Sequence, residues 1–326
     1  MKFFEDCTSR HIKWKRLPGG GTLYKVPANN EKGFNFDYYL FLPDEMNKTT
    51  TIFFESMNYK TSDNFSYDEA MEYWNTRFLG QKIHFLNQNT NYPVLYPLIP
   101  RYYDEKLKKE IYTIQLSSSC LKDDIDARYK RIDNQVVQMI NDARERLKNN
   151  NFEVDNKIIV NGFSASAKFA NRFALLHPDK IKMIIAGGLG GCLTLPLREL
   201  DGETLVYPVG VGNVDVITDE MLEEFKTIKQ FYFQGTNDKT DAFASTTDDN
   251  YEPYFKGIIE ENELKQLYKV FGRDIQDRWK KTQELYSQFN CNAIFKTYNS
   301  NHGYTDEIEH DIISFLNDNK KTHRLR

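Results

Sequence analysis

Residues 157–170 read KIIVNGFSASAKFA. A β-branched apolar run at residues 157–160 enters the pentapeptide GFSAS at residues 162–166, and a helical pattern follows. This order is typical of a nucleophile elbow, a strained strand-to-helix turn with a serine at its tip, and it predicts Ser164 as the nucleophile. Ser166 stands where the commoner motif has glycine, but it is small enough to weaken the pattern without breaking it. Taken alone, the stretch also fits an ordinary surface serine. The choice between a nucleophile and a surface residue therefore depends on the rest of the chain.

The composition is that of a globular protein with no polyanionic partner. A chain of 326 residues with 40% hydrophobic content can bury a full core. The formal net charge is −4 and no basic block is present, which argues against binding to nucleic acid or to an anionic membrane. We find neither a secretory signal nor a stretch of transmembrane length, and we expect a cytoplasmic protein. The cysteines are far apart, which favours free thiols in a reducing compartment: Cys7, Cys120, Cys192 and Cys291.

The chain before the elbow alternates strand and helix patterns. Residues 22–27 and 34–42 are rich in aromatic and branched side chains and predict an antiparallel hairpin. Residues 51–55 form a continuous apolar run, as expected for a strand that is buried on both faces. Residues 92–101 predict the next strand, with an irregular end because of its prolines. Apolar residues recur at helical spacing over residues 127–149, which predicts a helix that covers the sheet.

After the elbow, the strand pattern returns twice. Residues 181–186 predict a parallel strand that runs into the glycine-rich stretch at residues 187–191. We reject a dinucleotide-binding loop there, because the spacing is not Gly-x-Gly-x-x-Gly and no clear helix follows. Residues 230–234 predict a further strand, and Asp238 follows its end. An acid just past such a strand, and after the nucleophile in the chain, is a candidate to orient a catalytic histidine.

Other aspartates in this region compete with Asp238. Asp241 is close enough in sequence to take the same role, and Asp248 or Asp249 could bind a cation instead. Any of the four could also be a loop-capping residue.

The last part of the chain adds a long helical segment and a histidine. A helical pattern covers about residues 254–289, too long for a simple connection between neighbouring strands. We predict that residues 251–289 form a helical cap over the substrate site, although their aromatic residues fit an ordinary covering helix equally well. Residues 293–298 predict the last strand, and His302 lies in the loop after it. A final helix is expected over residues 306–317.

The candidate serine, aspartate and histidine thus each follow the end of a predicted strand. Their chain order, serine before aspartate before histidine, is the order that goes with a nucleophile elbow. The sequence predicts an α/β protein, residues 1–326 as a single domain, with a mostly parallel central sheet flanked by helices and a helical insertion before the last strand. Residue type, chain order and structural context agree at all three positions. This agreement favours a catalytic role over three unrelated surface residues.

The chain resembles the α/β-hydrolase superfamily along most of its length. Within it, residues 161–166 (NGFSAS), 169–173 (FANRF) and 176–178 (LHP) are most similar to the polyhydroxybutyrate-depolymerase and feruloyl-esterase-like branches. The departures are Ser166 for glycine and the long helical segment before the last strand.

The resemblance implies a Ser164–His302–Asp238 triad in a serine esterase. It also implies an oxyanion hole that combines the Ala165 N–H with a donor from Asn58 or Tyr59, in the loop after the strand at residues 51–55. Such a mechanism requires no metal and no organic cofactor, and the expected partner is a small-molecule ester.

Three functions remain open on the sequence alone. The favoured one is hydrolysis of a carboxylic ester of modest size. The same residues would also serve an acyltransferase or a peptidase, because the elbow specifies neither leaving group nor acceptor. The third is a catalytically silent binding protein, against which the intact serine, aspartate and histidine argue. The sequence does not define the oligomeric state.

Overall fold

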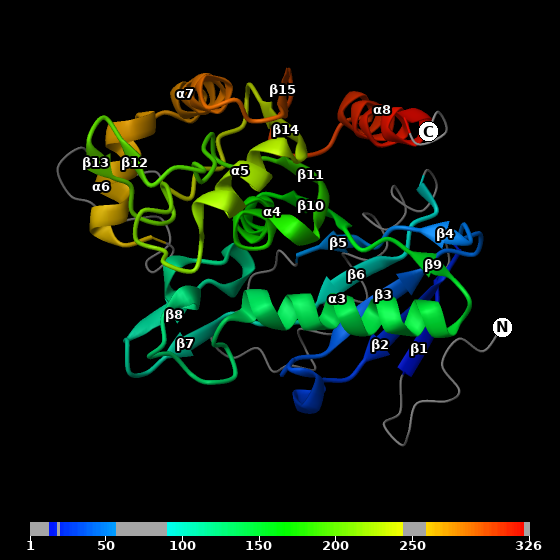
Figure 1. Ribbon diagram of the computed structural model, residues 1–326. Helices are drawn as coiled ribbons and strands as arrows, with labels where there is room; N and C mark the ends of the chain where they lie inside the picture. Colours follow the sequence, from blue (N-terminus) through cyan, green and yellow to red (C-terminus); the bar gives the residue numbers. More distant parts are fainter. Residues whose placement is uncertain (1–12, 18–19, 57–89, 244–258, 323–326) are drawn as a thin grey trace.

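A large twisted sheet with helices on both faces organises the molecule (Figure 1). The computed structural model describes residues 13–17, 20–56, 90–243 and 259–322. Within these ranges the sheet has nine strands, in the spatial order β1-β2-β3-β6-β5-β10-β11-β14-β15. Their bounds are β1 Lys13–Arg16, β2 Thr22–Val26, β3 Tyr38–Leu42, β5 Phe53–Glu55, β6 Val94–Pro97, β10 Ile158–Phe163, β11 Ile181–Gly187, β14 Lys229–Gly235 and β15 Ala293–Tyr298.

The sheet changes from antiparallel to parallel along its width. β1, β2, β3 and β6 pair antiparallel, and this includes the hairpin predicted from residues 22–42. From β6 through β5, β10, β11 and β14 to β15, every pair is parallel. The prediction of a mostly parallel α/β sheet is therefore confirmed. Because parallel strands end at a common edge, Ser164, Asp238 and His302 all follow strand ends on the same side of the sheet.

Helices cover the two faces of the sheet unequally. Their bounds among the described residues are α3 Ile132–Asn149, α4 Ala165–Leu176, α5 Asp219–Thr227, α6 Glu261–Phe271, α7 Ile275–Gln288 and α8 Asp306–Thr322. Buried side chains of α3 to α7 share one apolar core, whereas those of α8 belong to a second core on the opposite face. Alternation along β10 serves both cores: Ile158 and Val160 face the first, and Ile159 faces the second.

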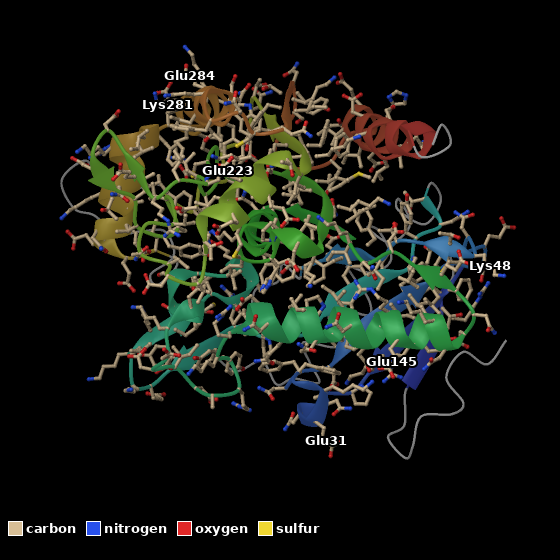
Figure 2. All side chains as sticks on the ribbon, in the orientation of Figure 1. Glu31, Lys48, Glu145, Glu223, Lys281 and Glu284 are labelled. Atoms are coloured by element: carbon tan, nitrogen blue, oxygen red, sulfur yellow. The ribbon has the colours of Figure 1, made fainter. Side chains whose placement is uncertain are left out.

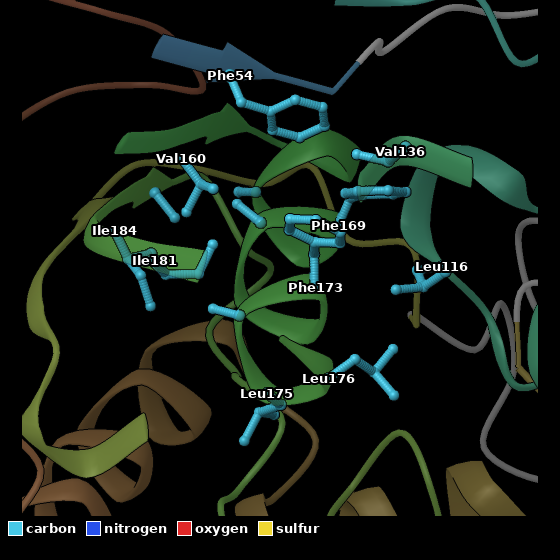
Figure 3. Packing of buried hydrophobic residues seen from close by; sticks show 14 of the residues in the cluster. Phe54, Leu116, Val136, Val160, Phe169, Phe173, Leu175, Leu176, Ile181 and Ile184 are labelled. Atoms are coloured by element: carbon cyan, nitrogen blue, oxygen red, sulfur yellow. The ribbon is translucent and has the colours of Figure 1, made fainter. Parts of the chain in front are cut away.

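Helix α4 is the centre of the larger core (Figure 3). Phe169 and Phe173 of this helix stack on each other, and both contact Phe54 of β5, with ring centroids 5.6–5.9 Å apart. The helix ends at Leu176, since Pro178 cannot continue it. Packing on several sides fixes α4, and therefore fixes the turn that precedes it.

In the described part of the chain, three short strand pairs lie outside the main sheet. β4 pairs with β9 in parallel, while β7 with β8 and β12 with β13 form antiparallel pairs. Their bounds are β4 Thr49–Thr50, β9 Glu153–Val154, β7 Tyr102–Asp104, β8 Lys109–Ile111, β12 Glu199–Leu200 and β13 Glu203–Thr204.

Within the described residues, the predicted helical segment before the last strand is present as two helices, α6 and α7, with the break at Gly272. Its first part, residues 251–258, lies outside the described residues. Two of its aromatic residues pack on the sheet side. Trp279 donates from Nε1 to Thr297 Oγ1 on β15 at 2.8 Å, and Tyr286 donates from its hydroxyl to the Thr194 carbonyl at 2.9 Å. These two contacts are those of a covering helix. That residues 251–289 act as a cap stays a prediction.

Charged residues of the helices lie both inside and outside the molecule. Asp133, Arg172 and Arg278 are buried, whereas the labelled side chains lie on the surface (Figure 2): Glu31, Lys48, Glu145, Glu223, Lys281 and Glu284. In the part of the chain that the structure describes, no helix is both long and apolar enough to span a bilayer.

Candidate active site

Ser164 occupies a sharp turn between β10 and α4. Its φ of 62° and ψ of −121° are unusual for a residue with a side chain. A Cβ on Gly162 would lie 2.3 Å from the carbonyl oxygen of Ser166, so the approach of helix to strand requires glycine there. The Ser164 N–H donates to the Gly187 carbonyl of β11 at 2.9 Å, which fixes the turn to the neighbouring strand. This is the geometry that the nucleophile elbow predicts.

Ser166 replaces the usual glycine without disturbing the turn. Its hydroxyl accepts a hydrogen bond from the Phe163 N–H and donates one to the Phe163 carbonyl, both at 2.8 Å. The side chain is buried, and the hydroxyl satisfies two backbone groups of a turn that lacks regular partners. The substitution at this position is therefore compatible with the elbow.

Asp238 and His302 lie side by side, 64 residues apart in the chain. His302 Nδ1 is 2.8 Å from Asp238 Oδ2, and the Asp238 side chain is buried, whereas 22% of the His302 side chain is exposed. Gln234 Nε2 donates to the same carboxylate oxygen at 2.7 Å, and the Thr240 N–H donates to the other at 2.9 Å. Gln234 was not predicted to belong to the site, although a glutamine within the apolar run of β14 is a signal of a buried polar role.

These hydrogen bonds keep Asp238 ionised. Burial by itself raises the pKa of a carboxyl group. At Asp238 the hydrogen bonds from His302, from the Thr240 N–H and from Gln234, with the charge of His302, outweigh that effect, and the pKa lies below its ordinary value. The carboxylate is thus a permanent acceptor for His302 at neutral pH.

The imidazole of His302 lies against the elbow. Its ring centroid is 4.6 Å from that of Phe163, the residue before Ser164. A Cβ on Gly188 would come within 3.0 Å of His302 Cε1 and 2.9 Å of the Phe163 ring, so the chain passes close to both. Ser164 Oγ makes no hydrogen bond to any described residue, His302 included.

The competing aspartates do not share this environment. Asp241 accepts from the Arg278 guanidinium and from the Phe243 N–H, and these are the partners that the structure gives it. Asp248 and Asp249 lie outside the described residues.

One predicted oxyanion donor can be located. Ala165 is the first residue of α4, and its N–H has no acceptor among the described residues. A free N–H at a helix N-terminus, beside the serine, is placed to bind a developing anion. Asn58 and Tyr59, expected to supply the second donor, lie outside the described residues.

Comparisons with known proteins agree with this architecture. No protein-family model and no curated protein sequence matches the chain. Among solved structures, the chain is similar to poly(aspartic acid) hydrolase-1 from Sphingomonas sp. KT-1, with a TM-score of 0.55 and 15% identity over 92% of this chain and 98% of that one. It is also similar to LpqC, a poly(3-hydroxybutyrate) depolymerase from Bordetella parapertussis, with a TM-score of 0.56 and 12% identity over 92% and 91% of the two chains. Identities this low speak for architecture, and together with the sheet order and the elbow they show that the chain has the α/β-hydrolase fold.

Proposed function

We propose that the protein is a serine hydrolase that cleaves carboxylic esters through a covalent acyl-enzyme. The observation that carries the proposal is the position of His302, bonded to the Asp238 carboxylate on one side and packed against the Ser164 turn on the other. A nucleophile, a base and an orienting acid are the components that acyl transfer requires at neutral pH.

His302 acts first as the general base. Because Nδ1 is held by Asp238, Nε2 remains for proton exchange. A serine hydroxyl is a poor nucleophile at neutral pH, so Nε2 takes its proton as Oγ attacks the acyl carbon. Asp238 fixes the tautomer and stabilises the imidazolium that forms, and its lowered pKa keeps it negative throughout. The imidazolium then protonates the leaving alcohol.

The oxyanion of the tetrahedral intermediate is bound by the Ala165 N–H and by a second donor, which we assign to Asn58 or Tyr59. In known cases, removal of one such donor raises the barrier by about 3–4 kcal/mol. Water then attacks the acyl-enzyme while His302 takes a proton from that water. The imidazolium returns this proton to Ser164 Oγ as the acyl–oxygen bond breaks, and the carboxylic acid is released. None of these steps calls for a metal or an organic cofactor.

Activity-based labelling tests the proposal directly. The wild-type protein should bind a fluorophosphonate covalently at Ser164 and hydrolyse activated short-chain esters, and Ser164→Ala should do neither. Addition of alcohol or amine acceptors during turnover measures whether water is the preferred acceptor or whether the enzyme is an acyltransferase. If a folded wild-type protein neither labels nor hydrolyses any ester, the proposal is wrong and the chain is a binding protein with a hydrolase fold.

A further inference from the structure

A small cavity is lined in part by Leu189, which belongs to the glycine-rich segment after β11 whose Gly188 lies against His302. Its empty volume is about 280 Å³, part of it open to solvent. That figure includes open solvent and the gaps between wall atoms, and the room for a bound molecule is about that of one water, so only a ligand of a few atoms fits. The cavity wall includes Lys168 and Arg172 of α4, Cys192, Thr194, and the rings of Phe243 and Phe271.

The Lys168 side chain is buried there without a partner of opposite charge. Only 6% of the residue is exposed, and its Nζ lies 3.6 Å from the centroid of the Phe243 ring. Among the described residues, Lys168 makes no side-chain hydrogen bond and no ion pair. Burial lowers the pKa of Lys168 to about 7, with smaller effects from Cys192, Arg172, Asp241 and Arg278. An ammonium taken out of water is costly unless a ligand or counter-ion compensates it.

The other charges near the cavity do not neutralise Lys168. Arg278 is fully buried and paired with Asp241. Arg172 donates from Nη1 to the Gln115 carbonyl at 2.8 Å and from Nε to the Thr194 hydroxyl at 3.3 Å, both neutral acceptors.

The remaining titratable groups are a carboxyl and a thiol. Glu263 is buried near Arg172, but it accepts from the Glu260 N–H at the start of α6, and burial raises its pKa. Burial also raises the pKa of the Cys192 thiol, so that it stays uncharged. Counted over the described residues alone, with Lys168, Arg172 and Arg278 protonated and Asp241 and Glu263 ionised, one positive charge is left over.

We propose that this cavity binds a single carboxylate, or an oxyanion of similar size, held by the Lys168 ammonium. The position supports this ligand as much as the charge does. A Cβ on Gly190 would lie 3.9 Å from both Lys168 Nζ and Asp241 Oδ1, and Gly188 of the same segment contacts His302. The Lys168 ammonium and the His302 imidazole therefore adjoin the same glycine-rich segment, two residues apart. The bound anion is either a carboxylate of the substrate itself, a case that rests on the proposed function, or a free anion that occupies a separate site.

Thermal unfolding tests for the anion independently of catalysis. Sodium formate, compared with sodium chloride at constant ionic strength and pH 6.5, should raise the Tm of the wild-type protein by about 2 °C at roughly ten times the Kd. Lys168→Met keeps the length of the side chain and should lose this shift. Lys280→Met, on the exposed surface of α7, should keep it. No formate-specific shift in the wild type, or an equal shift in Lys168→Met, would overturn the proposal.

A second measurement needs no variant. Formate binds the protonated amine, so the wild-type shift should shrink as pH rises from 6.5 to 8.5, through the pKa of about 7. If Lys168→Met does not fold, an undiminished shift at pH 8.5 would count against Lys168 as the ligand.

Ester kinetics then separate the two sources of the carboxylate. 4-Nitrophenyl hemisuccinate and 4-nitrophenyl butyrate have acyl chains of equal length, and only the first carries a carboxylate. If the substrate supplies the anion, Lys168→Met should raise KM for the hemisuccinate roughly tenfold or more and leave KM for the butyrate nearly unchanged, and formate should compete with the hemisuccinate. If the anion is free, both esters should respond alike. A protein that formate stabilises but that hydrolyses neither ester keeps the anion site and loses the proposed function.

Discussion

Helix α4 has a histidine–aspartate pair at each end, and the two pairs have almost the same geometry. At its N-terminal end, next to Ser164, His302 Nδ1 is 2.8 Å from Asp238 Oδ2. At its C-terminal end, His177 Nε2 is 2.9 Å from Asp133 Oδ2. Both carboxylates are buried, and both pairs join elements that are distant in sequence. Distance alone does not separate the pair that we propose to be catalytic from the other pair.

The other partners of each carboxylate do separate them. Asp133 is also bound by the Arg131 guanidinium, at 2.9 Å from Nε and 2.7 Å from Nη2. Its charge is therefore already balanced, and protonation of His177 would gain little from it. Asp238 receives its other hydrogen bonds from an amide and a backbone N–H, both neutral. Only there does an imidazolium meet an uncompensated negative charge, and only there is a serine on a strained turn close by.

The largest expected effect is at Ser164, because no serine on a strained turn lies beside the C-terminal pair. Ser164→Ala should reduce kcat by about 10⁶-fold, because a triad without its nucleophile retains only binding and oxyanion stabilisation. The Tm should fall little, since one half-buried hydroxyl with no hydrogen bond to the described residues contributes little to folding. Ester turnover and thermal unfolding of the same preparation check both parts. Activity within tenfold of wild type would remove the assignment.

Asp238→Asn tests the N-terminal pair itself. We expect about a 10⁴-fold loss of kcat, because asparagine cannot hold the correct tautomer or stabilise the imidazolium. At the other end, substitution of the histidine, His177→Asn, should leave kcat within a few-fold of wild type. Stopped assays with one activated ester are sufficient for both variants. Equal losses would mean that the two pairs do not differ in the way proposed.

Asp241→Asn asks whether a nearby buried carboxylate could replace Asp238. It removes the partner of the fully buried Arg278, so the free energy of unfolding should fall by about 3 kcal/mol. Turnover by the folded protein should change far less than in Asp238→Asn. Urea unfolding and active-site titration together separate the two effects. A ranking in which Asp241→Asn is the slower enzyme would transfer the acid role to Asp241.

The smallest effect on activity is expected at the C-terminal pair. Burial raises the pKa of Asp133, but the bonds from Arg131 and His177 outweigh it and lower the pKa to about 2. A depressed carboxyl pKa stabilises the fold above its unfolded value of about 4, and this contribution is lost as pH falls from about 4 towards 2. Asp133→Asn should therefore cost about 2 kcal/mol at pH 7, with kcat unchanged. Urea unfolding from pH 7 to pH 3 should show the difference from wild type shrinking. A difference independent of pH would contradict this account.

Much of the fold could be predicted because its signals are local. The apolar runs gave the main strands, and the last strand was placed at the bounds that the structure has. The helix expected over residues 127–149 begins only at Ile132, because Arg131 takes a left-handed conformation, with φ 47°, that propensity does not reveal. The short side pairs, such as β7 with β8, were not predicted, since two or three residues carry no periodicity.

The candidate site likewise has a part that could be predicted from the sequence and a part that could not. The elbow and the order of its three residues could be predicted, because a turn and two strand ends are features of sequence. The choice between Asp238 and Asp241 could not, because it depends on whether a histidine or an arginine from distant elements arrives beside each. Lys168 lies within the elbow stretch, but no feature of the sequence assigns it a role. Its helix is packed on several sides, and a periodic pattern does not show that a polar residue is buried.

The backbone at Ser164 has a thermodynamic meaning as well as a chemical one. Its φ of 62° and ψ of −121° lie in a region that glycine adopts without strain and that costs other residues about 1–3 kcal/mol. A glycine at position 164 would relax this turn, and a chain shaped by folding alone would drift towards it. Serine at this position is therefore expected to lower the melting temperature relative to glycine. Engineering that rewarded only a higher melting temperature would tend to replace it, and with it the nucleophile that we propose.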